Sequence, residues 1–455
     1  MGKLQEQIAS RLAGYGFESS PGLALVATLD GQEQLRVELG KASLEYGIPW
    51  TVDTVSHAAS IAKQFTAYAI ALLLEERKLD EHARPHSLLP EFPRCASDIT
   101  VSHLIHHTSG LRDQWDLLLM AGWRMDDVIT SDQIWKMLLA QQALNFPAGA
   151  EMLYSNSGYS VLARIIEVVS GRSFEDFLRE RVTAPLGLSK TFALVDHSTI
   201  VKNRAYGYKR SSDRRSFVRN DLSFANSGAT SLFCSVGDLV RWAEYQNALN
   251  SDESSLGRRL LSRGRTHSGT ELDYAYGAWV EMLGGDQIVY HDGWDAGYRA
   301  AVVRVPSRRA AIALLANGLE VPAIQLVFDA LEELLGSDKW RPERVRRIGM
   351  ATGSAGEQRP LAPPMCTGDV VGIYRSDELS TEYGIQTQGD ELVLTHSRHP
   401  SAPLSRTEVP GQYTGPNWIP ELTFQTAPDG VVSGFHVRSG RVRRVPFVKK
   451  IVKTR

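Results

Sequence analysis

Hydrophobic residues recur along this chain with two different periods, and each period predicts a different kind of element. Two β-rich runs, at 22–29 and 34–39, surround the dipeptide Asp30-Gly31, which is a strong signal for a hairpin with a two-residue turn. Residues 60–77 (SIAKQFTAYAIALLLEER) are helix-forming and largely apolar, which predicts a buried helix. Helical spacing of apolar residues predicts further helices at 3–13, 131–144, 158–170 and 173–184.

The pattern changes back to strands later in this part of the chain. Short strand-like runs separated by Gly or Pro-Ser are expected at 276–282, 287–291, 298–305 and 310–316. A last helix is expected at 322–335, returning across these strands. Two strands, a helical insertion, several strands and a closing helix predict an α/β (α+β) fold. In that fold one sheet is flanked by helices, and an all-helical lobe lies beside it.

A change in composition predicts a domain boundary. Residues 338–364 are dominated by Arg, Gly, Ser and Pro, which is typical of a linker. Short alternating runs then follow at regular spacing and predict a small antiparallel β-sandwich or β-barrel. We therefore expect a first domain at 1–337, a linker at 338–364 and a β domain at 365–455. The runs lie at 370–374, 383–388, 391–396, 408–413, 422–426, 431–437 and 442–447.

Composition and charge narrow the function classes. The 455 residues contain 50 Lys+Arg and 52 Asp+Glu, so the formal charge of −2 offers no global attraction for nucleic acid. No apolar run approaches the roughly 18 residues that a membrane span needs. The N-terminal residues lack the apolar core of a secretory signal, so we expect a cytoplasmic protein. The three cysteines (Cys95, Cys234 and Cys366) lie too far apart for a disulfide framework or a CxxC metal site.

The first candidate for chemistry is Ser60-Ile61-Ala62-Lys63, at the start of the predicted buried helix. Residues three apart share a helix face, so the Lys63 ammonium can reach the Ser60 hydroxyl. Serine becomes a good nucleophile only when a base takes its proton. Lysine can be that base if burial and positive neighbours lower its pKa. The alternative is chance, because Ser-x-x-Lys is a short pattern.

Two further candidates are weak by themselves. Tyr154 and Asn156 precede a predicted helix. In a functional interpretation, the Tyr154 phenol transfers protons and the Asn156 amide donates to the substrate. The alternative is a loop tyrosine followed by a helix cap. His291-Asp292-Gly293, followed by Trp294, could place a positive or hydrogen-bonding group opposite the serine. Gly293 would leave room there for a substrate backbone. Asp-Gly is equally typical of a hairpin turn.

Taken together, the three motifs are more specific. About 90 residues separate Ser-x-x-Lys from Tyr-x-Asn, and about 135 more lead to His-x-Gly. This order resembles the penicillin-recognising serine hydrolases, whose third element is usually Lys-Thr-Gly. The His-x-Gly variant resembles the D-aminopeptidase and esterase branch of peptidase family S12, close to the class C β-lactamases and DD-peptidases. The segments VSHLIHHTSGL and NFPAGAEMLYSNSGYSVLARIIEVVSG carry the same resemblance over roughly residues 20–335. The C-terminal part is similar to the lipocalin-like β domain often appended to these enzymes, which implies a small antiparallel β-barrel.

The resemblance implies a role for each residue. Ser60 attacks the acyl carbon, and Lys63 and Tyr154 share its proton. Tyr154, assisted by His291, then protonates the leaving group. Asn156 holds the substrate amide. The backbone N–H groups of Ser60 and Trp294 are expected to form the oxyanion hole. Neither a metal nor an organic cofactor is implied.

Other conspicuous residues have plainer explanations. His103, His106 and His107 crowd together, but no carboxylate or thiol completes a zinc site, and the family uses this segment as a structural loop. Arg441, Arg443 and Arg444 are candidates for holding a substrate carboxylate, against the alternative of solvated side chains. The loop 415–418 is a candidate for reaching back over the active site.

Three functions compete at this point. The first is a hydrolase of amide or ester bonds in small peptides that contain a D-residue, similar to a D-aminopeptidase or amidase. The second is acyl transfer by a penicillin-binding-protein-type thioesterase that macrocyclises nonribosomal peptides, with a thioester on a carrier protein as donor; a carboxylesterase belongs with it. The third is a non-catalytic penicillin-binding sensor. None of them involves nucleic acid or a membrane.

Overall fold

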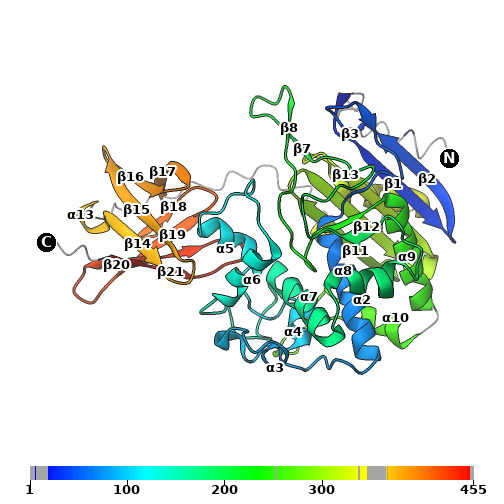
Figure 1. The fold of residues 1–455 in the computed structure, drawn as a ribbon, viewed down its shortest axis with the longest axis horizontal. Helices are drawn as coiled ribbons and strands as arrows, with labels where there is room; N and C mark the ends of the chain where they lie inside the picture. Colours follow the sequence, from blue (N-terminus) through cyan, green and yellow to red (C-terminus); the bar gives the residue numbers. More distant parts are fainter. Residues whose placement is uncertain are drawn as a thin grey trace.

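The computed structural model describes residue 6 and residues 19–251, 254–336, 339–345, 365 and 367–450. The helix expected at 3–13 therefore lies outside the described residues. The same holds for most of the expected linker at 338–364. The domain limits at 337 and 365 stay a prediction. The described residues form a larger unit of sheet and helices and a smaller β unit that projects from it (Figure 1).

The larger unit is built on one six-stranded antiparallel sheet, as the strand pattern predicts. The strand order is β10-β11-β12-β13-β1-β2. The hairpin turn between β1 and β2 has Asp30 at φ 52° and Gly31 at φ 72°, so both turn residues are left-handed, as the Asp-Gly signal requires. The strands are β1 (Leu23–Leu29), β2 (Gln32–Leu39), β10 (Trp279–Leu283), β11 (Asp286–Asp295), β12 (Tyr298–Val305) and β13 (Ala310–Ala316).

Helices cover both faces of this sheet. Leu25, Val303 and Leu314 face one way and pack with Phe328 of α11 (Ala323–Leu335). The alternate sheet residues pack on the other side with α2 (Ala62–Glu75) and α9 (Val236–Ser251). The pattern predicted α11 but not α9, whose 16 residues have a mixed polar and apolar sequence without a clean apolar stripe. The central strands are buried on both faces, which explains their continuous apolar runs.

In the sequence, the helical lobe lies between the strands β1 and β2 and the strands β10 to β13. The helix expected at 131–144 is α6 (Ser131–Leu139), which ends earlier than expected; just after it, the Gln141 side chain hydrogen-bonds the Arg112 backbone. The helix expected at 173–184 is divided into α8 and a π-helical turn. None of the described helices is long and apolar enough to cross a membrane. The lobe helices are α3 (Pro85–Leu88), α4 (Val101–Ile105), α5 (Gln114–Met120), α6, α7 (Asn156–Ser170), α8 (Phe174–Leu178) and the π-turn η5 (Arg179–Thr183).

Small elements complete the larger unit. The three-stranded sheet β5-β9-β6 lies next to the start of α2, and two two-stranded sheets pair β3 with β4 and β7 with β8. These short elements are β3 (Lys41–Ser43), β4 (Ile48–Pro49), β5 (Ser56–His57), β6 (Phe192–Ala193), β7 (Tyr208–Arg210), β8 (Phe217–Arg219), β9 (Leu232–Cys234), α10 (Ser255–Leu260), and the 3-10 turns η3 (Ala59–Ile61), η4 (Arg94–Ala96) and η6 (Pro306–Arg308).

The smaller unit is a closed antiparallel barrel, which confirms the β-barrel that the lipocalin-like resemblance implies and rules out the sandwich that the strand pattern also allowed. β14 pairs with β21 and closes the ring. The pattern missed β17, which contains Pro400 and Pro403, and it placed a strand at 408–413 where only Gln412 and Tyr413 are in β18. The strands are β14 (Gly372–Ser376), β15 (Thr381–Gln388), β16 (Glu391–His396), β17 (His399–Arg406), β18 (Gln412–Thr414), β19 (Glu421–Thr426), β20 (Val432–Arg438) and β21 (Val445–Lys449), preceded by α13 (Thr367–Val370).

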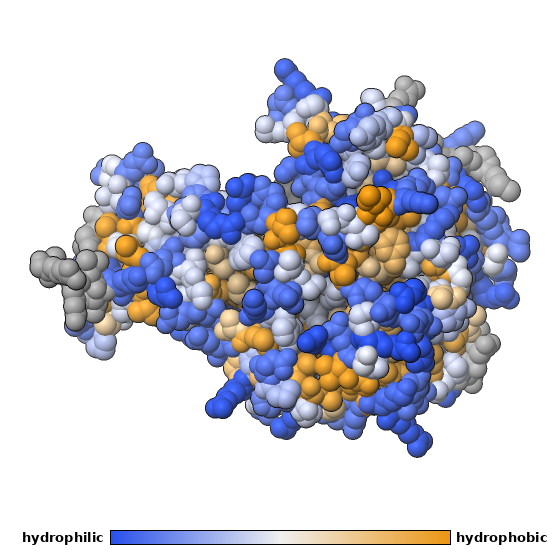
Figure 2. All heavy atoms as spheres, in the orientation of Figure 1, coloured by the Kyte–Doolittle hydropathy of each residue, from blue (hydrophilic) through white to orange (hydrophobic). Residues whose placement is uncertain are grey.

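The barrel packs against the helical lobe through α5. Leu117 and Met120 belong to the same buried cluster as the barrel core. Beside them, Arg112 Nη1 donates to both carboxylate oxygens of Glu378, at 2.6 and 2.7 Å, and the two side chains are only 3% and 2% exposed. Both units therefore share one buried interface. Figure 2 shows mostly polar residues over the face of both units that it presents, with apolar residues in scattered patches.

The buried Arg112–Glu378 pair generates a stability prediction. Arg112→Met leaves the Glu378 charge buried without a partner, which is expected to lower the free energy of unfolding by about 3–5 kcal/mol. The double variant Arg112→Met/Glu378→Leu is expected to recover most of that loss, because both charges are gone. Urea denaturation, monitored by tryptophan fluorescence, measures the free energy of unfolding of both variants. A single variant as stable as the parent would show that the pair does not hold the interface.

Candidate active site

Ser60 lies on a tight turn between β5 and α2. The preceding Ala59 is fully buried and has φ 48°, a left-handed conformation that is uncommon for a residue with a side chain. Its N–H donates to His57 Nδ1 at 3.1 Å, and His57 is itself buried. This turn places Ser60 in a cleft of about 660 Å³ between the helical lobe and the β11 edge of the sheet.

Lys63 lies beneath Ser60 and has no contact with solvent. Its Nζ donates to Ser60 Oγ at 3.1 Å, to Asn156 Oδ1 at 2.7 Å and to the Ala229 carbonyl at 2.8 Å. All three acceptors are neutral. Burial therefore lowers the pKa of Lys63 to about 7, against the smaller opposing effect of Asp113. An amine in this state can accept a proton from Ser60 near neutral pH.

Tyr154 lies just before α7 and faces the same turn. The Lys63 Nζ lies 4.9 Å from the centroid of its ring, and its hydroxyl is buried without a hydrogen-bond partner among the described residues. Burial raises the pKa of Tyr154 above its usual value, and Ser60 opposes that effect. The resting residue is therefore a neutral phenol. A phenolate is disfavoured here because the nearby Lys63 ammonium, which would stabilise it, is itself easily deprotonated.

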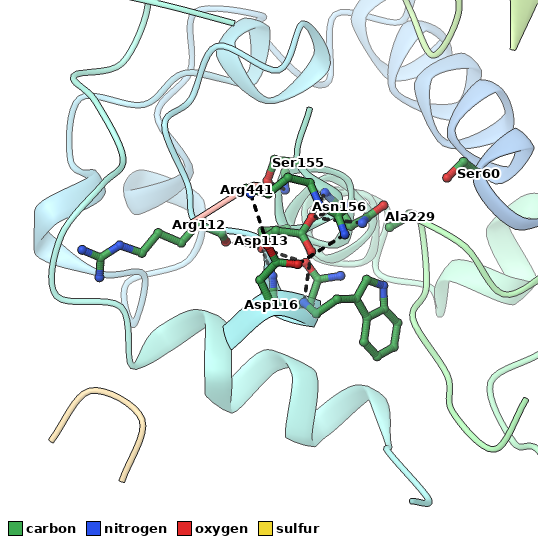
Figure 3. A network of polar contacts seen from close by, with 12 residues as sticks. Ser60, Arg112, Asp113, Asp116, Ser155, Asn156, Ala229 and Arg441 are labelled. Atoms are coloured by element: carbon green, nitrogen blue, oxygen red, sulfur yellow. Dashed lines mark hydrogen bonds and ion pairs between the residues drawn. The ribbon is translucent and has the colours of Figure 1, made fainter. Parts of the chain in front are cut away.

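Asn156 is held by a buried carboxylate that the motif search missed. Asp113 Oδ2 accepts the Asn156 backbone N–H at 2.8 Å and its side-chain Nδ2 at 3.0 Å. Asp113 also caps α5 through the Trp115 N–H, and an Asp before a helical run was the available signal. Figure 3 shows Asp113 between Asn156 and Arg441. The amide of Asn156 is thereby fixed, with its oxygen on Lys63 and one N–H still free to donate.

His291 does not contact Ser60. Its Nε2 lies 3.2 Å from the Tyr274 hydroxyl and its Nδ1 lies 2.6 Å from the Asp292 carbonyl. The His291 and Tyr154 rings are 6.0 Å apart. Burial lowers the pKa of His291 to about 4, so the ring is neutral at physiological pH. Tyr274, which the sequence analysis also missed, connects His291 to the packing around Tyr154.

The sequence alternative of a turn at Asp292-Gly293 is wrong. β11 continues to Asp295, and the turn is at Ala296-Gly297. A Cβ on Gly293 would lie 2.6 Å from the Ala58 carbonyl oxygen and 3.0 Å from Ala59 Cβ. The glycine is thus required by the close approach of β11 to the nucleophile turn; that it also leaves room for a substrate backbone stays a prediction. Trp294 is 69% exposed, under the Arg299 guanidinium.

The barrel reaches the cleft through the loop between β20 and β21. Arg441 lines the cleft with Ser60, and its Nη1 lies 3.3 Å from Asp113 Oδ2 and its Nη2 3.4 Å from Asp116 Oδ1. Arg443 pairs instead with Glu151, and the Arg444 carbonyl accepts from Arg112. The loop 415–418 does not reach the site: Trp418 stacks on His399, 4.3 Å away within the barrel. The sequence therefore named the wrong barrel loop, since periodicity does not show which end of a barrel faces its neighbour.

The three histidines of the helical lobe have structural contacts. His103 closes the capping box of α4 with Thr100, and His106 hydrogen-bonds the carbonyls of Ser102 and Ser262. His107 Nδ1 accepts the Ser155 N–H at 3.1 Å, and its ring packs 4.3 Å from that of Tyr154. His107 thus helps to place the Tyr154 loop.

Known proteins resemble this chain in sequence and in fold. The chain is 28% identical over 339 residues to the D-aminopeptidase of Brucella anthropi, a match that covers 73% of this chain but only 63% of that relative. A solved octameric penicillin-binding protein homologue from Pyrococcus abyssi superposes with a TM-score of 0.65 at 22% identity, over 98% of this chain and 99% of that one. The D-amino acid amidase of Ochrobactrum anthropi SV3, solved with D-phenylalanine, gives a TM-score of 0.60 at 21% identity, over 73% of this chain and 99% of that one.

The whole-length likeness to the archaeal structure shows that sheet, helical lobe and barrel together form a known fold. The Beta-lactamase family profile matches residues 8–331, well over half of the chain, and includes Ser60, Lys63, Tyr154 and His291. This chain belongs to the Beta-lactamase family.

Proposed function

We propose that this protein is a serine hydrolase that cleaves amide bonds of small peptides or amides through an acyl-enzyme on Ser60. The observation that carries the proposal is the contact between Ser60 Oγ and the buried Lys63 amine. Burial keeps the pKa of that amine at about 7, so a neutral base is present beside the hydroxyl. The relatives named as a D-aminopeptidase and a D-amino acid amidase support a substrate with a D-residue on the acyl side.

In the first half-reaction, Ser60 Oγ bonds to the carbonyl carbon and its proton passes to Lys63. The oxyanion is bound by the backbone N–H groups of Ser60 and Trp294. Tyr154 gives its proton to the departing amine, the C–N bond breaks, and Lys63 returns a proton to Tyr154. The ester that remains on Ser60 is then attacked by water, and the same groups carry the protons in reverse.

The surrounding residues position these groups. The second N–H of Asn156 donates to the substrate amide carbonyl, while Asp113 prevents the amide from rotating. Neutral His291 supports Tyr154 through Tyr274. Arg441 pairs with Asp113 and holds it in place. The sequence suggested that Arg441 holds a carboxylate of the substrate. Its pairing with two carboxylates of the protein competes with that role.

Replacing the nucleophile tests the proposal directly. Ser60→Ala is expected to abolish turnover and covalent adducts with D-configured amides and activated esters while the protein stays folded. Intact-mass spectrometry beside the parent protein, with L-configured analogues for comparison, measures both. Normal rates in the variant would overturn the assignment. Capture of the acyl group by an added amine in place of water would favour the acyl-transfer alternative.

The pKa of Lys63 predicts how the rate depends on pH. Lys63 acts as a base only when it is neutral, so kcat/KM on an uncharged N-acetylated substrate is expected to fall about tenfold per pH unit below its pKa of about 7 and to level off above it. Lys63→Arg, whose guanidinium stays charged, is expected to be inactive throughout. A flat profile between pH 5 and 8 would contradict Lys63 as the base.

Gly293 offers a test of the strand's close approach. Gly293→Ala forces β11 away from the Ala58–Ala59 turn, and a shift of this kind is expected to lower kcat by roughly 100-fold. Gly237→Ala in α9 is the matched control, because its Cβ would meet nothing closer than 3.8 Å. Equal kcat values in the two variants would show that the spacing is not critical.

A further inference from the structure

One wall of the cleft carries polar groups that the proposed mechanism does not use. Asp295 ends β11, and Thr230 precedes β9; both line the same cavity as Ser60. Asp295 Oδ2 and Thr230 Oγ1 are both buried, and the Thr230 hydroxyl lies close enough to lower the pKa of the Asp295 carboxyl; neither oxygen has another hydrogen-bond partner within the part of the chain that the structure describes. Burying a carboxylate and a hydroxyl without strong partners costs free energy on folding, so the presence of both groups in this wall needs an explanation.

The other charged groups of the cleft are already paired. Arg441 lies between Asp113 and Asp116, and Arg344 Nη2 lies 3.2 Å from Asp292 Oδ1. Lys63 is satisfied by three neutral acceptors. Asp295 is therefore the carboxyl of this cavity for which no arginine or lysine pair is formed. Burial raises the pKa of Asp295 to about 7, which is the expected response of an acid in such surroundings.

The position of Asp295 in the strand limits what could bind there. Trp294, whose N–H is proposed to hold the oxyanion, is its immediate neighbour, and adjacent Cα atoms are about 3.8 Å apart. A group on the carbon next to the scissile carbonyl would therefore come close to the Asp295 carboxyl. A primary ammonium on that carbon would supply the missing positive charge and donors for the Asp295 carboxyl that lines the cavity.

We propose that Asp295, positioned by the Thr230 hydroxyl, binds the α-ammonium of the residue whose carbonyl is attacked by Ser60. The inference rests on the proposed function and refines it: the substrate is cleaved after its free N-terminal residue. Asp295 is then a specificity-determining residue, because acylation of the amine removes the charge that it binds. Trp115, Leu119 and Met125 on the opposite side of the cleft offer apolar contacts to that residue's side chain.

Binding to a protein that cannot react tests this without depending on turnover. In a Ser60→Ala background, D-phenylalanine amide is expected to bind at least about tenfold more tightly than N-acetyl-D-phenylalanine amide by calorimetry. Adding Asp295→Asn is expected to weaken the binding of D-phenylalanine amide by about 10- to 100-fold and to change the affinity for the acetylated ligand by less than about threefold. Equal affinities for the two ligands, or an unchanged ratio in the variant, would overturn the inference.

Asp292→Asn is the matched control. Asp292 lines the same wall three residues earlier, but its charge is paired with Arg344, so the ratio of the two affinities is expected to stay within about twofold of the parent's. Asp295→Asn is also expected to melt at the same temperature as the parent or higher, because it removes an unpaired buried charge. A lower melting temperature together with weaker binding of both ligands would mean a structural role and would contradict the proposal.

Kinetics separate this inference from two other outcomes. On the Ser60 background, Asp295→Asn is expected to raise KM for D-phenylalanine p-nitroanilide and to leave kcat/KM for the N-acetylated anilide nearly unchanged. Equal losses of kcat/KM on both substrates, with a shifted pH profile, would mean that Asp295 acts only through the pKa of Lys63, which would contradict the inference. Failure of the proposed function is distinguished by the absence of any Ser60 adduct with an activated ester, whatever the ratio of affinities.

Discussion

The arrangement of the site depends on the burial of one lysine. Lys63 has no solvent contact and no adjacent carboxylate, so the structure must supply neutral acceptors from three separate parts of the chain: Ser60, Asn156 and Ala229. A lysine surrounded by carboxylates would be a stable cation and a poor base. Here burial and neutral partners make its proton easy to lose, and the proposed chemistry requires that condition.

The barrel is part of this arrangement. A continuous series of contacts runs from Arg441 in the barrel through Asp113 and Asn156 to Lys63, and Figure 3 shows its central part. The series includes a guanidinium, a carboxylate and an amide, each of which limits the orientation of the next. The buried Arg112–Glu378 pair holds the two units together one residue before Asp113. The β unit therefore helps to shape the active site, although its sequence carries none of the family motifs.

Conformational cost is concentrated where β11 meets the nucleophile turn. Ala59 adopts a left-handed backbone there, and Gly293 leaves space for the Ala58 carbonyl. Asp295, a buried carboxyl without an arginine or lysine pair among the described residues, lies on the same wall beside Thr230. A fold optimised only for stability would relieve these features, so their occurrence around one serine is consistent with selection for a binding and reacting surface.

The sequence by itself determined the elements that have strong local signals. The Asp30-Gly31 hairpin, the strand Ala310–Ala316 and the buried helix after Ser60 follow from turn chemistry and apolar runs, and the order of the three motifs indicated the family. The lipocalin-like resemblance implied the barrel, but only the tertiary structure decided that α9 covers the sheet and which barrel loop enters the cleft. It also revealed Asp113, Tyr274 and Asp295. Their neighbours in space are far away in the sequence, and the burial and pairing of a side chain depend on those neighbours, which no local pattern records.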